Sequence, residues 1–407
     1  MNRVIAVIVF AFVPVVCVAP GFAGDAGQTE DRKLTASDAD ASDYFGVSVA
    51  VSGTIAVVGA FSDDHSGLLD TGSAYVFDRM TGQQVAKLTA SDADQSDQFG
   101  YSVAVSGTTA VVGAPGANRI SAGPAGSAYV FDLPGGQQVA ELTASDADEG
   151  DWFGWSVAVS GTTAVVGAIN DDHSGLTNAG SAYVFDLTTG QQVAKLISSD
   201  AGENDYFGWS VAVSGTTAVV GSPLDDHSGP TNAGSAYVFD LTTGQQVAKL
   251  TASDANQSDR FGDSVAVSGT TVVVGADKDN HSGIVDAGSA YVFDLTTGQQ
   301  VAKLTASDAE LNDDFGESVA VSGTTVVVGT RFNEHSGLTN PGSAYVFELS
   351  PCLADLAEPS GVLDLADIAA FVGAFLFQLD TADINNDAIW DLSDIAAFLN
   401  SFNAGCP

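Results

Sequence analysis

The stretch FGVSVAVSGTIAVVGA, residues 45–60, decides the fold of this chain. Large and small side chains alternate from Phe45 to Ser52, which is the period of two expected of a β-strand. The Ser-Gly-Thr sequence that follows predicts a tight turn, and the apolar run of residues 55–58 suits a strand buried on both faces. The stretch therefore predicts a β-hairpin.

This hairpin belongs to a repeat with a fixed period of 54 residues. The phrase KLTASD begins at Lys33, and close copies begin at residues 87, 141, 195, 249 and 303. Each unit also contains GSAYVF, residues 72–77 in the first unit, and the first five units continue into a fourth strand pattern, residues 84–89 in the first. Four strands per unit and a fixed period predict an all-β, six-bladed β-propeller with four-stranded blades, spanning residues 24–350.

The two ends of the array predict how the ring closes. The sixth unit stops near Leu349 without a fourth strand, and an unattached fourth strand, residues 32–37, precedes the first unit. We expect this N-terminal strand to join the last blade, because closure leaves no sheet edge free to aggregate.

Charge and composition exclude two classes of protein. The 407 residues include 51 acidic and only 12 basic ones, for a net charge of −39, and 45% are hydrophobic. Nucleic-acid binding requires clustered Lys and Arg, which are absent from the sequence. A disordered acidic chain would lack the regularly placed apolar residues found here.

The first residues have the pattern of a signal peptide. Arg3 is followed by an apolar segment from Val4 to Val18, and small residues lie near position 23. We expect residues 1–23 to be removed and the protein to be secreted or held at the cell surface. No later apolar run is long enough for a transmembrane segment. Cys352 and Cys406 then remain as an even pair, which favours a disulfide in an oxidising compartment.

The segment 351–407 differs from the repeats and predicts a small α-helical domain. LADIAAF at residues 365–371 recurs as LSDIAAF at residues 392–398, which indicates a duplicated loop and short helix. The loop before the second copy has the oxygen-donor spacing that Ca²⁺ requires. Its expected ligands are Asp383, Asn385, Asp387, the backbone carbonyl of Ile389, Asp391 and Asp394. A weaker first loop contains Asp355, Asp364 and Asp367.

Two families resemble this chain. The Phe-Gly and Gly-Ala-Pro phrases, seen best at Phe99-Gly100 and 113–115, resemble the FG-GAP repeat of integrin alpha-subunit propellers and many secreted bacterial proteins. Integrin-type propellers have seven blades rather than six. Their calcium loop is replaced here by Ser-Gly-Thr, which is too short to wrap a cation, so calcium in the blades is not implied.

The C-terminal duplication, together with the terminal Ala-Gly-Cys-Pro, resembles a cysteine-flanked dockerin. This resemblance implies a calcium-binding F-hand pair that docks onto a cohesin-like or other docking protein through residues 352–407. A bridge between Cys352 and Cys406 would then join the two ends of the module.

The units differ most at the positions flanking Phe-Gly, and these differences predict a ligand-binding rim. Just after Phe-Gly, units two to six carry Tyr101, Trp155, Trp209, Asp263 and Glu317, and Trp152 precedes the third Phe. Exposed aromatics stack on sugar rings or anchor proteins. The alternative is that these side chains fill gaps between blades.

The sequence therefore favours a non-enzymatic binding or adhesion protein. Its propeller would recognise a protein or glycan, and its C-terminal module would attach it to a partner in a calcium-dependent manner. No nucleophile elbow, phosphate loop or zinc-protease motif is present. Two alternatives remain open: a dockerin-borne enzyme of extracellular polysaccharide degradation, and an inert surface spacer.

Overall fold

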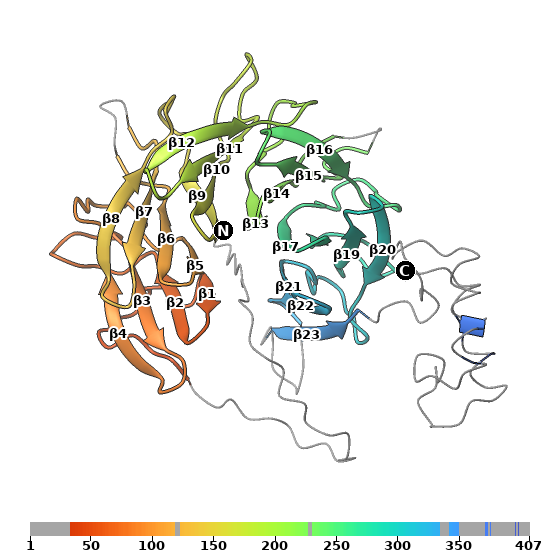
Figure 1. The fold of residues 1–407 in the computed structure, drawn as a ribbon, viewed down its shortest axis with the longest axis horizontal. Helices are drawn as coiled ribbons and strands as arrows, with labels where there is room; N and C mark the ends of the chain where they lie inside the picture. The colour runs from red at the N-terminus through yellow and green to blue at the C-terminus, as the bar shows by residue number, and fades with distance from the viewer. Residues whose placement is uncertain are drawn as a thin grey trace.

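A computed structural model describes residues 33–118, 123–226, 230–333 and 342–349, with Phe371, Val372, Phe375, Ile395 and Phe398. Within these residues, 23 strands form six antiparallel sheets, arranged radially as the blades of a propeller (Figure 1). The same residues include no helix with the length and apolar character needed to cross a membrane.

Each blade is a meander of consecutive strands that runs from the centre to the outside (Figure 1). The first blade consists of β1 (Val49–Ser52), β2 (Ile55–Ala60), β3 (Ser73–Asp78) and β4 (Gln83–Leu88). The others are β5 (Ser102–Ser106), β6 (Thr109–Ala114), β7 (Ser127–Asp132) and β8 (Gln137–Leu142); β9 (Phe153–Ser160), β10 (Thr163–Ala168), β11 (Ser181–Asp186) and β12 (Gln191–Leu196); β13 (Ser210–Ser214), β14 (Thr217–Ser222), β15 (Ser235–Asp240) and β16 (Gln245–Leu250); β17 (Ser264–Ser268), β18 (Thr271–Ala276), β19 (Ser289–Asp294) and β20 (Gln299–Leu304); and β21 (Ser318–Ser322), β22 (Thr325–Thr330) and β23 (Ser343–Glu348).

The predicted hairpin is confirmed, with a two-residue connection. Ser52 pairs with Ile55, so Gly53 and Thr54 alone join β1 to β2. Gly53 has a φ of +57°, a left-handed conformation that glycine adopts without steric cost. The strand before it starts later than predicted, at Val49, because Tyr44 and Gly46 also have positive φ and interrupt the extended backbone.

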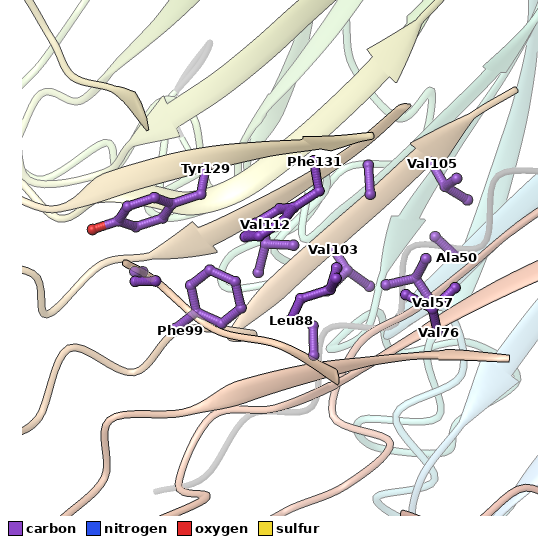
Figure 2. Packing of buried hydrophobic residues seen from close by; sticks show 14 of the residues in the cluster. Ala50, Val57, Val76, Leu88, Phe99, Val103, Val105, Val112, Tyr129 and Phe131 are labelled. Atoms are coloured by element: carbon purple, nitrogen blue, oxygen red, sulfur yellow. The ribbon is translucent and has the colours of Figure 1, made fainter. Parts of the chain in front are cut away.

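Neighbouring blades pack a small-residue face against a large-residue face, as the alternation predicted. Ala50, Val57 and Val76 of the first blade lie in one buried cluster with Phe99 and Phe131 of the second (Figure 2). Burying one such aromatic side chain contributes about 2–3 kcal/mol, and the cluster recurs at each following interface between blades.

The glycines of the repeated phrases permit this close packing. A methyl group on Gly167, near the end of β10, would overlap the carbonyl oxygen of Gly208 in the next blade. Ser156 of β9 donates its hydroxyl to that same carbonyl oxygen at 2.8 Å. The Phe-Gly glycine of one blade and the Gly-Ala glycine of its neighbour therefore form one contact, which explains why both recur in each unit.

Within the described residues, a partly buried ionic cluster recurs in four of the blades. In the third blade, Lys195 Nζ lies 2.7 Å from Asp146 Oδ2 and 2.9 Å from Asp171 Oδ2, and 5.2 Å from the ring centre of Tyr183. Tyr183 and Ser181 both donate hydroxyl hydrogen bonds to Asp171. Burial alone would lower the pKa of Lys195, but the hydrogen bonds and charges of the two carboxylates raise it above its usual value.

The same cluster explains one of two recurring aspartates that precede each Phe-Gly. Asp146 belongs to the cluster, whereas Asp151 caps a turn by accepting the backbone N–H of Asp148 at 2.7 Å.

The predicted ring closure is wrong in this structure. The sixth sheet has three strands within the described residues, and residues 33–36 belong to no strand. Leu34 and Ala36 pack on the first blade, and Ser37 N–H donates to Gln84 Oε1 at 2.9 Å. Leu88 makes the same contact with the second blade and also pairs with Ala74 of β3, so residues 33–36 keep the packing of a fourth strand but form none of its ladder within the described residues. Val346 on β23 consequently remains 66% exposed.

Candidate functional site

The residues that follow Phe-Gly lie at the start of the inner strands and form an arc around the centre of the propeller. Tyr101 and Trp155 have ring centres 4.7 Å apart, and Trp155 and Trp209 have ring centres 5.2 Å apart. These three side chains come from consecutive blades, and each is less than one tenth exposed. The structure thus brings together three of the residues that the sequence singled out.

A second layer of aromatic residues lies beside this arc. Trp152 stacks on Trp155 with ring centres 5.4 Å apart and an angle of 11° between the rings, and it is 39% exposed. Tyr206 meets Trp209 edge to face, and Phe61 meets Tyr101 in the same way.

These two layers line a pocket of about 800 Å³, which we call the aromatic pocket. Its polar walls include Asn170, whose side-chain amide donates to the carbonyl of Gly150, and Asn178, whose amide donates to Asn204 Oδ1. The lining residues are Phe61, Ser96, Gln98, Tyr101, Pro115, Gly116, Asn118, Pro124, Trp152, Trp155, Ile169, Asn170, Asn178, Tyr206 and Trp209. This set combines flat apolar surfaces with amide donors and acceptors, and it contains no ionisable acid or base apart from the tyrosines.

The packing interpretation of the buried rim aromatics is confirmed, and ligand binding at these residues stays a prediction. Trp155 and Trp209 fill space between neighbouring blades, as the packing alternative predicted, and they also form one wall of the aromatic pocket. The indole Nε1 of Trp155 is buried and has no hydrogen-bond partner in the structure. A buried donor without a partner costs free energy, which a ligand acceptor would recover.

The residue before each Phe has a left-handed backbone. Trp152 has a φ of +58°, and Tyr44, Gln98, Tyr206, Arg260 and Asp314 have φ values between 54° and 59°. A non-glycine residue pays about 1–2 kcal/mol for this conformation. Since the conformation occurs in all six blades, it is a property of the repeat. In blade three it holds the side chain of Trp152 against the mouth of the pocket.

The arc continues into charged residues in blades five and six. Asp263 and Glu317 occupy the positions that Trp155 and Trp209 hold in blades three and four. Arg331 Nη2 lies 2.9 Å from Glu317 Oε1, and Lys278 pairs with Asp314. We call this group, Asp263, Asp277, Lys278, Asp314, Glu317 and Arg331, the charged arc. Burial raises the pKa of Glu317 to about 7, and the charge of Arg331 only partly offsets that rise.

Several residues of the site were missed from the sequence. Phe61, Ile169 and Asp277 share one position of the repeat, directly after the second strand, and Asn170 follows at the next. Like the predicted positions, these vary among units that are otherwise nearly identical. Comparing the six units at every position, rather than only beside Phe-Gly, would have identified them.

The repeated histidines do not form a site among the described residues. His65, His173 and His281 lie in equivalent loops, where each Nδ1 is 3.4 Å from the hydroxyl of the following serine. In the same part of the chain, no three His, Cys, Asp or Glu side chains are arranged to hold a metal ion. These three histidines therefore belong to a turn that recurs in the repeat.

The other predicted sites lie outside the described residues. These are the signal peptide, the Cys352 and Cys406 pair, and both calcium loops with the ligands Asp383, Asn385, Asp387, Ile389, Asp391, Asp394, Asp355, Asp364 and Asp367. In the same C-terminal segment, Phe371 and Phe398 are described. They are equivalent residues of the two duplicated phrases, they are buried, and their rings stack with centres 4.0 Å apart.

Comparison with known proteins identifies the repeats. The FG-GAP repeat family model matches residues 28–77, 83–131, 137–185, 191–239, 245–293 and 299–347, which together make up more than half of the chain. No curated protein matches the chain. Each matched segment contains the inner three strands of one blade, from the Phe-Gly turn to the SAYVF strand. The chain therefore belongs to the FG-GAP repeat family and folds as a six-bladed β-propeller.

Proposed function

We propose that this chain is a secreted, non-enzymatic binding protein that takes a carbohydrate in the aromatic pocket and is attached to a partner by its C-terminal module. The FG-GAP propeller fold is consistent with a binding or adhesion role. The observation that carries the proposal is the pocket itself, in which Trp152, Trp155, Tyr101 and Trp209 meet amide side chains within one cavity.

The chemistry of the pocket favours a sugar over a protein segment. A pyranose presents an apolar C–H face, which stacks on an indole, and a rim of hydroxyls, which exchange hydrogen bonds with Asn and Gln side chains. A cavity of about 800 Å³ accommodates a short oligosaccharide. Both requirements are met by side chains from blades one to four.

The pocket also favours binding without catalysis. Cleavage of a glycosidic bond requires a pair of carboxyl groups on either side of the scissile bond. The residues that line the aromatic pocket include neither Asp nor Glu. A polysaccharide-degrading enzyme therefore remains only the alternative that the sequence left open.

Attachment to a partner is proposed for residues 352–407. Its support is the duplicated sequence with oxygen donors at calcium-loop spacing and the stacking of Phe371 on Phe398, which brings the two copies together. In this proposal Ca²⁺ organises the loops, and the paired module docks onto a cohesin-like protein. The signal peptide would place both functions outside the cell.

The test is a binding survey with the full chain lacking residues 1–23. We expect saturable binding of a neutral β-linked oligosaccharide by isothermal titration calorimetry. Trp155→Ala removes one stacking surface and should weaken that binding by about ten-fold or more, because an aromatic contact of this kind contributes about 1–2 kcal/mol. Val193→Ala, at an exposed position on the outer strand β12, is the matched control and should leave affinity unchanged.

Two results would contradict the proposal. One is a chain that binds no oligosaccharide of the cello-, xylo-, manno- or chito- series. The other is equal affinity for the parent chain and the Trp155→Ala variant, provided that both have the same far-ultraviolet circular dichroism.

A further inference from the structure

Two exposed aromatic rings lie at equivalent positions of the repeat, directly before Phe-Gly. Trp152 in blade three is 39% exposed, and Tyr44 in blade one is 44% exposed. Trp152 stacks on Trp155. Tyr44 stacks in the same manner on Phe61, with ring centres 5.1 Å apart and an angle of 9° between the rings. Each exposed ring therefore has one face covered by an inner ring and leaves its other face accessible.

Tyr44 lies beyond the aromatic pocket but in contact with its wall. It is not one of the residues that line the pocket, whereas Phe61 is. Phe61 meets Tyr101 edge to face with ring centres 5.5 Å apart, and Tyr101 contacts Trp155. Aromatic contacts thus run without a break from blade one to blade three, and the apolar surface extends past the pocket over blade one.

The backbone holds both exposed rings in place. The carbonyl of Tyr44 accepts the N–H of Val47 at 3.1 Å, and the carbonyl of Trp152 accepts the N–H of Trp155 at 3.2 Å. Both exposed residues also have the left-handed φ that is common to this position. A side chain that a turn and a ring stack already fix loses little freedom when a ligand binds, so more of its contact energy appears as affinity.

The aromatic surface does not extend in the same way toward blades five and six. At the equivalent position of blade four, Tyr206 meets its aromatic neighbour edge to face rather than in a stack. Arg260 and Asp314 hold this position in blades five and six. These charged side chains offer no flat apolar face to a sugar ring. The stacked pairs therefore give the surface a direction, from the pocket toward blade one.

We infer that the ligand of this surface is an extended polysaccharide chain, with Trp152 and Tyr44 as two separate stacking platforms. This inference rests on the proposed function and names its substrate class. Blade two lies between the platforms, so one pyranose ring, which is comparable in width to an indole, covers only one of them. Gln98, the equivalent residue of blade two, lines the pocket and offers an amide to the hydroxyl groups of an intervening sugar unit.

The experiment measures affinity against chain length by calorimetry on the full chain. The probes are the disaccharide to the hexasaccharide of the cello-, xylo-, manno- and chito- series. In a series that binds, we expect affinity to rise about five-fold to ten-fold from the disaccharide to the hexasaccharide, as one further aromatic contact predicts. Tyr44→Ala should remove this gain and leave the affinity for the disaccharide unchanged. Trp152→Ala should weaken the binding of every length.

The repeat supplies the controls for these variants. Blade two carries Gln98 with a left-handed φ like that of Tyr44, so the fold does not require an aromatic residue at this position. Tyr44→Phe keeps the ring and should retain the dependence on length. Met80→Ala is the matched control, because Met80 is 56% exposed and follows the end of β3 that lies beside Ile55, at the end of blade one away from Tyr44.

The outcomes separate this inference from the proposed function. Equal affinity for the disaccharide and the hexasaccharide of a series that binds would overturn the extended ligand and leave sugar binding intact. A dependence on length that persists in Tyr44→Ala would overturn it as well. Failure of every oligosaccharide to bind would overturn both proposals.

Discussion

The partly buried ionic cluster of the third blade gives a prediction whose size can be worked out from the structure. Lys195→Met removes the cation that lies 2.9 Å from Asp171, a carboxylate whose side chain is 4% exposed. Removing one partner of a buried pair costs about 3–5 kcal/mol, because the remaining charge is uncompensated. Lys195 is itself 24% exposed, and Ser181 and Tyr183 still donate to Asp171, so we expect a lower cost of about 2–3 kcal/mol.

The sixth blade supplies the compensating change. There Asn333 replaces the aspartate, and Ser343 Oγ donates to its Oδ1 at 2.8 Å, so a neutral amide fits the same place. Asp171→Asn in the Lys195→Met background should therefore restore about 1–2 kcal/mol of the loss. Asp171→Asn alone should cost about 1 kcal/mol, since Lys195 keeps its contact with Asp146.

The assay is urea unfolding of all three variants, followed by circular dichroism, together with amide hydrogen exchange in β11 and β12. Exchange reports the loss within the blade even when the array does not unfold in one step. Two results would refute the reasoning: a cost below about 0.5 kcal/mol for Lys195→Met, or a double variant whose loss equals the sum of the two single losses.

Three further predictions follow from other parts of the molecule. Gly167→Ala should destabilise the propeller by at least about 3 kcal/mol in urea, because its methyl group meets the backbone of Gly208, whereas Gly135→Ala, which has open space around it, should cost nothing measurable. Burial raises the pKa of Asp259 to about 6, so the folded chain binds more protons than the unfolded chain from about pH 4 to pH 6. The unfolding free energy therefore falls as pH rises through that window. Asp259→Asn should reduce the total fall across the window by an amount on the order of 1–3 kcal/mol, and an unchanged fall would refute the assignment. The full chain should bind Ca²⁺ in calorimetry, and Asp383→Ala with Asp394→Ala should remove at least one site; no binding to the unchanged chain would end the calcium proposal.

Much of the fold could be predicted from the repeat. Alternation in residues 45–52, the Ser-Gly-Thr turn and the fixed period gave the strands, the six blades and the opposition of small and large faces. These features depend on local patterns that recur in six units, and each unit predicts the same strands and turns. The closing strand depends instead on pairing between the two ends of the chain, and no local pattern determines whether residues 33–36 form a ladder with β23.

The sequence predicted the aromatic part of the candidate site but not all the residues that line it. Variation beside Phe-Gly pointed to Tyr101, Trp155 and Trp209, because a side chain that differs among identical frameworks is not required by the framework. Asn178 could not be assigned in the same way, since its role depends on how loops of adjacent blades meet at one mouth. The ionic cluster of Lys195, Asp146 and Asp171 was missed because its members are up to 49 residues apart in sequence.

The location of sugar binding is the central claim, and tryptophan fluorescence tests it most directly. Trp152, Trp155 and Trp209 line the aromatic pocket, and the fourth tryptophan, Trp390, belongs to the C-terminal segment. In a Trp390→Phe variant, every remaining indole reports on the pocket. We predict that a bound oligosaccharide shifts the emission to shorter wavelength, with a midpoint equal to the dissociation constant from calorimetry. Calorimetric binding without any change in emission would place the ligand elsewhere and contradict the account.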